Sequence, residues 1–108
     1  MTTRTLQVLL ALAEKPLHGY GIKQSVEGRT GGAVRLGSGT LYEAVHRLQE
    51  QGWIEEVEAP ADEQPSGGPP RRFYALTAVG RSALGDELRR MDEVVRHARA
   101  LQLLGPGA

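Results

Sequence analysis

The chain has 108 residues, with 13 basic and 13 acidic side chains, 40% hydrophobic residues and no cysteine. This length predicts one domain with a modest core, and chains of this size often gain stability by dimerisation. The lack of cysteine excludes disulfides, thiolate metal sites and a cysteine nucleophile. With no leader at the N-terminus and no apolar run near the ~20 residues of a membrane span, we expect a cytoplasmic protein without a membrane partner.

The charges are unevenly distributed along the chain. Residues 15–54 hold five bases against three acids, residues 55–66 hold five acids and no base, and residues 67–82 hold three arginines and no acid. A net charge of zero argues at first against a nucleic-acid partner. A neutral total can nevertheless hide a basic face, so the charge balance does not exclude DNA.

The N-terminal part of the chain predicts two helices. Residues 5–13 (TLQVLLALA) are apolar on nearly every side, which predicts a helix buried on two faces, with a second subunit as one candidate cover. This helix ends before Pro16, because the residue preceding proline avoids the α region. A shorter helix is predicted over residues 18–26, followed by a turn at 28–32 and a short strand at 33–36 (AVRL).

The third predicted helix is amphipathic and starts in the sequence GSGTLYEAVHRLQEQG. Its apolar residues recur at helical spacing and define the buried face: Leu41, Ala44, Val45 and Leu48. Thr40 and Glu43 fit a capping box, whereas Gly37 or Ser38 would begin the helix one turn earlier. Gly52 is typical of the glycine that follows a helix end.

Two strands and a long helix are predicted in the rest of the chain. Residues 53–58 and 71–76 would form a β-hairpin whose tip, PADEQPSGGPP, is polar and rich in proline and glycine. Thr77 suits the N-cap of a final helix over residues 78–104. Apolar side chains recur along that helix as in a coiled-coil seam: Leu84, Leu88, Met91, Val95 and Ala98, widened by Val94, Leu101 and Leu104.

The small residues at the start of the third helix do not match a nucleotide-binding motif. A P-loop needs a lysine, and none stands between Gly39 and Thr40; a dinucleotide fingerprint needs a third glycine where Tyr42 stands. No metal-ligand spacing relates the three histidines, and no serine lies in G-x-S-x-G. Surface or capping positions are therefore predicted for His18, His46 and His97. The sequence predicts no catalytic residue, no metal, no cofactor and no enzyme activity.

The order of the elements indicates a different function. Three helices, a hairpin with a long tip and a capped final helix match the winged helix-turn-helix plan, a mainly α fold with a small β-sheet, whose third helix enters the DNA major groove. Glycines at its start would let the backbone approach phosphates. The predicted DNA contacts are Lys23, Ser38, Gly39, Thr40, Tyr42, Arg47, Arg71 and Arg72. A second interpretation stays open, in which acids of residues 55–58 pair with the arginines across the hairpin.

Four segments resemble the PadR-like family of transcriptional regulators. The segments are PLHGYGIK (16–23), GTLY (39–42), LQEQGWI (48–54) and RRFYALTAVG (71–80). The resemblance runs from about Leu6 to Leu88, and the joint occurrence of HGY, GTLY and Y-x-L-T-x-x-G at these separations is specific. The chain departs from the family at Gly37 and Ser38, where Ser-Pro is common, and at Gly21, where a helix-forming residue is usual.

The resemblance implies a repressor that binds a palindromic operator in double-stranded DNA as a homodimer. It also implies that the final helix makes most of the dimer contact and the first helix contributes. The expected interface residues are Leu6, Leu9, Leu10, Leu84, Leu88, Met91, Val95, Ala98 and Leu101. Because one helix follows the wing, the chain resembles the short form of the family, with residues 1–77 as DNA-binding domain, 78–104 as dimerisation helix and 105–108 as a frayed tail.

Two other functions stay open at this stage. The first is a winged-helix module that binds proteins without DNA, and the second is a sensor dominated by the site of a small-molecule effector. Some short family members bind aromatic drugs between tryptophans at the dimer centre. The single tryptophan here, Trp53, lies at the start of a predicted strand, so that pocket is not inferred. The operator, target genes and effector are not determined by the sequence.

Overall fold

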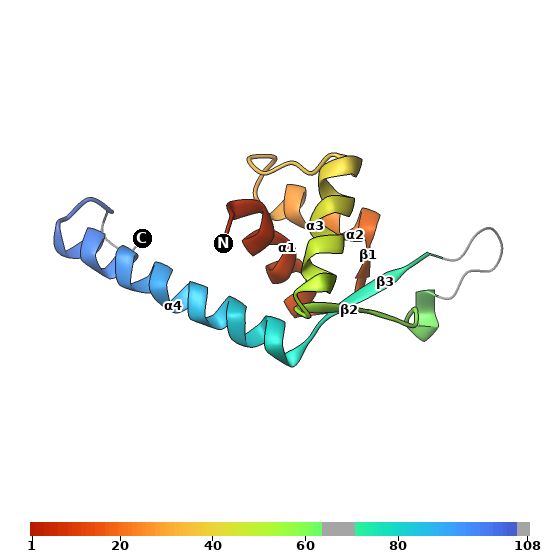
Figure 1. The fold of residues 1–108 in the computed structure, drawn as a ribbon. Coiled ribbons are helices and arrows are strands. Elements are labelled where there is room, and N and C mark those ends of the chain that lie inside the picture. The colour runs from red at the N-terminus through yellow and green to blue at the C-terminus, as the bar shows by residue number, and fades with distance from the viewer. Residues whose placement is uncertain (64–70, 106–108) are drawn as a thin grey trace.

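The computed structural model describes residues 1–63 and 71–105. In chain order the elements are α1 (Thr3–Glu14), β1 (Leu17–His18), α2 (Gly19–Arg29), α3 (Ser38–Glu50), β2 (Ile54–Val57), the 3-10 turn η1 (Ala61–Glu63), β3 (Phe73–Leu76) and α4 (Ala78–Ala100). Helices α1 to α3 gather in one body, β2 and β3 extend from it as a wing, and α4 runs out on the opposite side (Figure 1). This arrangement confirms the predicted winged helix-turn-helix fold.

Helix α1 lies at the centre of the core because its sequence is apolar on nearly all sides. Val8, Leu9 and Ala11 are completely buried, and Leu6 is 7% exposed. Helices α2 and α4 and strand β3 all contact α1. The second buried face of α1, for which another subunit was a candidate cover, is therefore covered by elements of the same chain. Leu6 and Leu9, expected at a dimer interface, have their side chains in the internal core.

The sheet contains a strand that the hairpin prediction missed. Strand β1 pairs antiparallel with β3, with Leu17 opposite Tyr74 and His18 opposite Phe73. Strand β2 pairs antiparallel with the other edge of β3, so that the order is β1-β3-β2. A strand of two residues has no periodicity of its own to reveal it in the sequence. It forms because the chain entering α2 passes along the free edge of β3.

Residues 33–36, predicted as a strand, form an irregular connection instead. Gly31 and Gly32 turn the chain with φ angles of 62° and 84°. The Val34 N–H then donates to the Thr30 hydroxyl at 3.1 Å, and Leu36 is anchored in the core at 1% exposure. The prediction was wrong because this backbone bonds to the end of α2 and not to a neighbouring strand.

The ends of α3 follow local sequence signals. Gly37 is the N-cap and makes no side-chain capping bond, so Thr40 lies within the first turn and the capping box is not used. At the other end Gly52 has a φ of 75°. The Trp53 N–H donates to Leu48 O and the Gly52 N–H to Gln49 O, both at 3.0 Å. These two bonds form a Schellman motif, which satisfies the last carbonyls of the helix as predicted.

Helix α4 begins as predicted and ends earlier. The Thr77 hydroxyl accepts from the Gly80 N–H at 3.0 Å, which confirms Thr77 as the N-cap. The helix stops at Ala100, four residues before the predicted end at Leu104, because Gln102 adopts a φ of 60° and the Leu103 N–H donates back to Ala98 O. A non-glycine residue in this left-handed position is uncommon, which is why the sequence did not reveal the stop.

The apolar stripe of α4 is divided between two environments. Leu84, near the start of the helix, is buried in the core with 4% exposure, although it was expected at a dimer interface. Further along the helix, Leu88, Met91 and Val95 are 37%, 44% and 37% exposed. The helix projects from the body, and the molecule measures 55 × 27 × 26 Å (Figure 1). Beyond its first turns, α4 therefore presents an apolar face with little cover from its own chain.

Candidate nucleic-acid interface

The start of α3 is open to a large partner. Ser38, Gly39, Thr40 and Tyr42 are all exposed, Tyr42 to 62%. A Cβ atom built on Gly39 would meet no other atom within 4 Å. The helix thus presents donors and a small residue at the end where helices of this fold meet base edges and phosphates.

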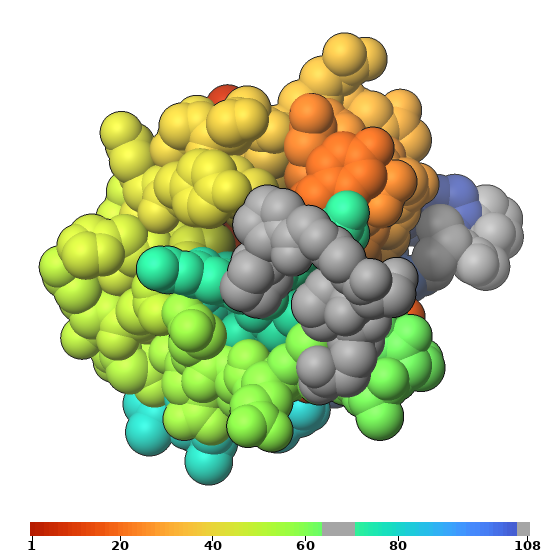
Figure 2. Space-filling model, turned by 90° about the vertical axis from the view of Figure 1, so that its right-hand side faces the viewer, coloured from red at the N-terminus to blue at the C-terminus, as the bar shows by residue number. Residues whose placement is uncertain are grey.

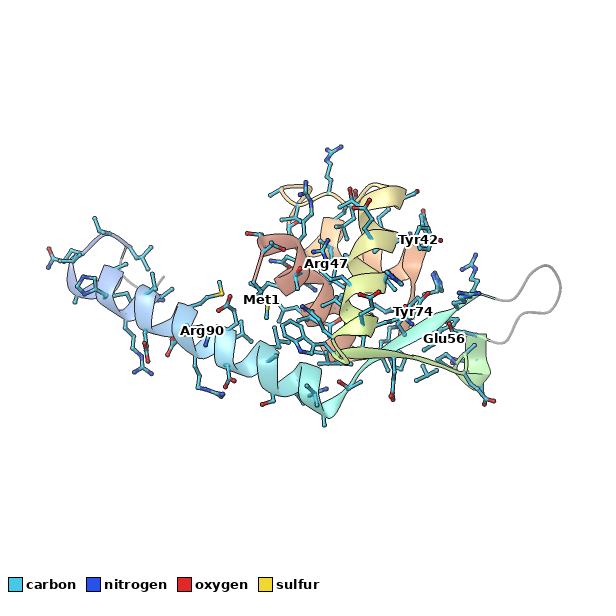
Figure 3. All side chains as sticks on the ribbon, viewed as in Figure 1. Met1, Tyr42, Arg47, Glu56, Tyr74 and Arg90 are labelled. Atoms are coloured by element: carbon cyan, nitrogen blue, oxygen red, sulfur yellow. The ribbon has the colours of Figure 1, made fainter. Side chains whose placement is uncertain are left out.

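The side chain of Tyr42, on α3, lies next to the start of α2. A Cβ atom built on Gly19 would lie 3.9 Å from the Tyr42 hydroxyl oxygen and 3.5 Å from Cδ2 of Leu41. The segments HGY and GTLY, separate in sequence, therefore adjoin in space. Figure 3 shows Tyr42 on the side of α3 that faces the wing. The surfaces of α2 (orange), α3 (yellow) and the start of β3 (teal) lie together on one face of the molecule (Figure 2).

The two arginines at the base of the wing have different neighbours. Nη1 of Arg71 lies 3.0 Å from Nε2 of His18. Nε of Arg72 lies 3.9 Å from a carboxylate oxygen of Glu56 on β2. Pairing across the hairpin, one of the two interpretations of the acidic strand, thus holds for Arg72. Among the described residues, no carboxylate forms an ion pair with Arg71.

Tyr74 lies on β3, opposite Glu56, and is 5% exposed (Figure 3). Burial is the main cause that raises the pKa of its hydroxyl; the Glu56 carboxylate adds to this effect, and Arg72 opposes it. The phenol is therefore neutral at physiological pH. Arg71, Arg72 and Glu56 carry charge beside this neutral phenol.

His18 caps α2 and lies beside Phe73 of β3 in the sheet. Its Nδ1 atom accepts from the Gly21 N–H at 3.0 Å. Its ring meets that of Phe73 edge-on, with centroids 5.1 Å apart and planes at 85°. Burial lowers the pKa of His18, the Arg71 charge lowers it further, and Glu63 acts in the opposite direction. A capping role was one of the two positions predicted for His18 from the sequence. No local sequence pattern indicates that it lies beside Arg71.

One predicted DNA contact, Arg47, lies apart from this group. Arg47 is on the other flank of α3 and lines a hollow of about 350 Å³ with Trp53 and Arg90. Figure 3 shows Arg47 and Tyr42 on different sides of the helix. Lys23 is half-buried on α2. The structure thus brings together the start of α3, His18 and the wing arginines, and separates Arg47 from them.

The described part of the chain contains neither a metal-site cluster nor a membrane-spanning helix. No cluster of three or more histidine, aspartate or glutamate side chains there has the arrangement of a metal site. None of its helices combines the length and apolarity needed to cross a bilayer.

A family model described as the transcriptional regulator PadR-like family matches residues 8–86. The chain belongs to this family. The match covers the helix-turn-helix, the wing and the start of α4, and it confirms the resemblance seen in the sequence. PadR-like proteins are a family of transcriptional regulators and not a family of enzymes.

A transcriptional regulator and an uncharacterised protein are similar over most of this chain. The transcriptional regulator Rv3488 of Mycobacterium tuberculosis is 33% identical over 91 residues, which cover 84% of this chain and 78% of that protein. An uncharacterised 37.1 kDa protein in transposon TN4556 of Streptomyces fradiae is 37% identical over 84 residues. That match covers 78% of this chain but only 21% of the Streptomyces protein.

Solved structures share the PadR-like fold. A PadR family transcription regulator from Clostridium difficile superimposes with a TM-score of 0.74 and 26% identity, covering 96% of this chain and 100% of that chain. Bacillus subtilis PadR in complex with operator DNA gives a TM-score of 0.69 at 21% identity, covering 81% of this chain and 47% of that chain. At that identity the second comparison shows the fold alone.

Proposed function

We propose that this chain is a sequence-specific DNA-binding regulator that acts as a homodimer on a palindromic operator and represses transcription. The observation that carries the proposal is the shared face formed by Gly39 and Tyr42 of α3 with Arg71 at the base of the wing. A winged helix-turn-helix meets DNA with these two elements, the helix in the major groove and the wing beside it. The operator complex of Bacillus subtilis PadR, a protein of the same fold, supports the proposal.

The residues on this face offer DNA two kinds of contact, neutral hydrogen-bond donors from α3 and positive charge from the wing. Ser38 and Thr40 offer neutral donors, and Gly39 leaves room for close approach of a sugar–phosphate backbone. Arg71 offers a cation that no acid neutralises among the described residues. We assign base contacts to the first turns of α3 and phosphate contacts to the wing. Arg47 is left out of this set because it faces the hollow beside Trp53.

The homodimer in this proposal is formed by α4. Leu88, Met91 and Val95 lie along one stripe of that helix and remain between 37% and 44% exposed. A two-fold dimer would present two copies of α3, which explains why the operator would be palindromic. Repression, release by a small-molecule effector and a cytoplasmic location are the parts of the proposal that rest on the family resemblance.

The test is affinity for a mixed-sequence DNA duplex across a salt series. We expect the affinity of the wild type to fall steeply with salt, and the Arg71→Ala/Arg72→Ala double variant to show a shallower dependence, by about one unit of slope per lost phosphate contact. Arg89→Ala removes an equally charged, exposed residue from α4 and should leave the slope unchanged. Absent or salt-insensitive binding by the wild type would contradict the proposal and favour a protein-interaction module.

A further inference from the structure

His18 and Arg71 bring two hydrogen-bonding groups to one point at the base of the wing. Nε2 of the imidazole and Nη1 of the guanidinium are 3.0 Å apart, although the residues are 53 positions apart in sequence. A guanidinium has only donors, so this contact is a hydrogen bond only if Nε2 of His18 presents its lone pair.

The hydrogen bond that caps α2 occupies Nδ1 of His18, so the proton of the neutral ring is on Nε2. With that proton in place, Nε2 cannot accept a hydrogen bond from Arg71. Nδ1 accepts from the Gly21 N–H at 3.0 Å and therefore carries no proton. In the neutral ring the proton is then on Nε2, which faces Arg71 as a second donor. The opposite tautomer would place the proton on Nδ1 and break the cap. A doubly protonated ring would also break it, and burial and Arg71 oppose that charge.

The imidazole is held in this orientation by its surroundings. The Gly21 N–H binds Nδ1 of the ring, and the ring of Phe73 packs against it in a T-shaped contact. Glu63 is the acid whose charge acts on His18. Among the described residues the ring has hydrogen-bonding contacts with Gly21 and Arg71 and none with Glu63. An oxygen placed beside both nitrogens could accept from the two donors at once.

We propose that the Nε2–H of His18 and the guanidinium of Arg71 together bind one phosphate of the DNA backbone. The inference rests on the DNA-binding function proposed above and deepens it. A phosphodiester supplies unesterified oxygens that accept from both donors, and its single negative charge matches one arginine beside a neutral imidazole. The site lies close to Tyr42, whose hydroxyl adjoins Gly19, the next residue after His18. Because the site adjoins α3, we assign the phosphate to a DNA backbone that lies along this helix.

The test is a double-mutant cycle of His18→Asn and Arg71→Ala, measured with a mixed-sequence duplex across a salt series. Asparagine is a good N-cap, so it keeps the acceptor for the Gly21 N–H and removes the Nε2 donor. We expect His18→Asn to leave the unfolding midpoint close to that of the wild type and to weaken binding about three- to tenfold. Because no charge is lost, its salt slope should equal that of the wild type, whereas Arg71→Ala should reduce the slope. In the Arg71→Ala background the effect of His18→Asn should shrink.

A second measurement does not depend on any variant. Nitrogen-15 NMR of the wild-type imidazole should show Nδ1 unprotonated and Nε2 protonated in the free protein. Adding the duplex should shift the Nε2–H resonance, and inorganic phosphate at the same ionic strength should not. A proton on Nδ1, an equal shift with inorganic phosphate, or independent effects of the two substitutions on affinity would each overturn the inference. Lack of salt-dependent duplex binding by the wild type would instead remove the proposed function itself.

Discussion

Gly80 in the first turn of α4 lies directly against the carbonyl of Trp53, which connects α3 to β2. A Cβ atom on Gly80 would stand 2.0 Å from Trp53 O and 2.9 Å from Cδ1 of Leu76. The same carbonyl accepts from the Thr77 N–H at 3.0 Å, and the Thr77 hydroxyl donates to Gly52 O at 2.7 Å. These contacts join the start of α4 to the end of α3. They therefore set the direction in which the apolar stripe of α4 leaves the body.

We expect Gly80→Ala to lower the free energy of unfolding by about 1–3 kcal/mol, because the new methyl group overlaps a backbone carbonyl that cannot move without breaking the Thr77 bond. The measurement is urea unfolding followed by circular dichroism. Gly28→Ala is the matched control: Gly28 is helical and exposed, and a Cβ there meets nothing within 4 Å. That variant should gain up to about 1 kcal/mol. Equal stability of the two variants would refute the close contact at Gly80.

The separate neighbours of Arg71 and Arg72 predict unequal effects on DNA binding. Arg72 is already paired with Glu56, so part of its charge is compensated before DNA arrives. Arg71→Ala should therefore reduce the salt slope of duplex affinity by about one unit, and Arg72→Ala by less. Glu56→Gln should strengthen binding, because it removes a negative charge beside the wing. Equal losses for the two alanine variants would show that the Glu56 pair does not persist on DNA.

The lowered pKa of His18 predicts that the folded protein loses stability in mild acid. Its pKa is lowered in the folded protein, chiefly by burial and then by Arg71, so the unfolded chain binds a proton more readily. The stabilisation is present above the ordinary histidine pKa of about 6.5 and is lost as pH falls below it. The unfolding midpoint of the wild type should thus decrease from about pH 7 towards the lowered pKa of His18. His18→Asn should flatten this part of the profile, and an unchanged profile would argue against the unprotonated Nδ1 cap.

The exposed stripe of α4 predicts that dimerisation can be abolished without unfolding the chain. Val95→Glu places a charge at a position that is 37% exposed in the single chain, so the internal core is unaffected. We expect this variant to sediment as a monomer at concentrations where the wild type is a dimer. Arg89→Glu introduces the same residue on another side of α4 and should leave the assembly unchanged. A monomeric wild type would contradict the proposed dimer.

Much of this fold is determined by local sequence. The helices follow their apolar periodicity. Helix α3 ends before Gly52, a glycine with positive φ, and α4 begins after Thr77, which caps it. These signals act over three or four residues, so they can be found without knowing the fold. The order of these elements was enough to predict the winged helix-turn-helix fold. The segments HGY, GTLY and Y-x-L-T-x-x-G together predicted the family.

Tertiary structure decided which residues meet. The short strand β1 exists because β3 offers it an edge, and Leu84 is buried in the core of a molecule in which α4 packs against α1. His18 and Arg71 approach each other across 53 residues, while Arg47, on the same helix as Tyr42, is directed to a different side. No periodicity or motif encodes such pairings, because they depend on how rigid elements pack around a shared core. The sequence therefore determined which elements form, and only their packing determined which side chains share the candidate DNA-binding face.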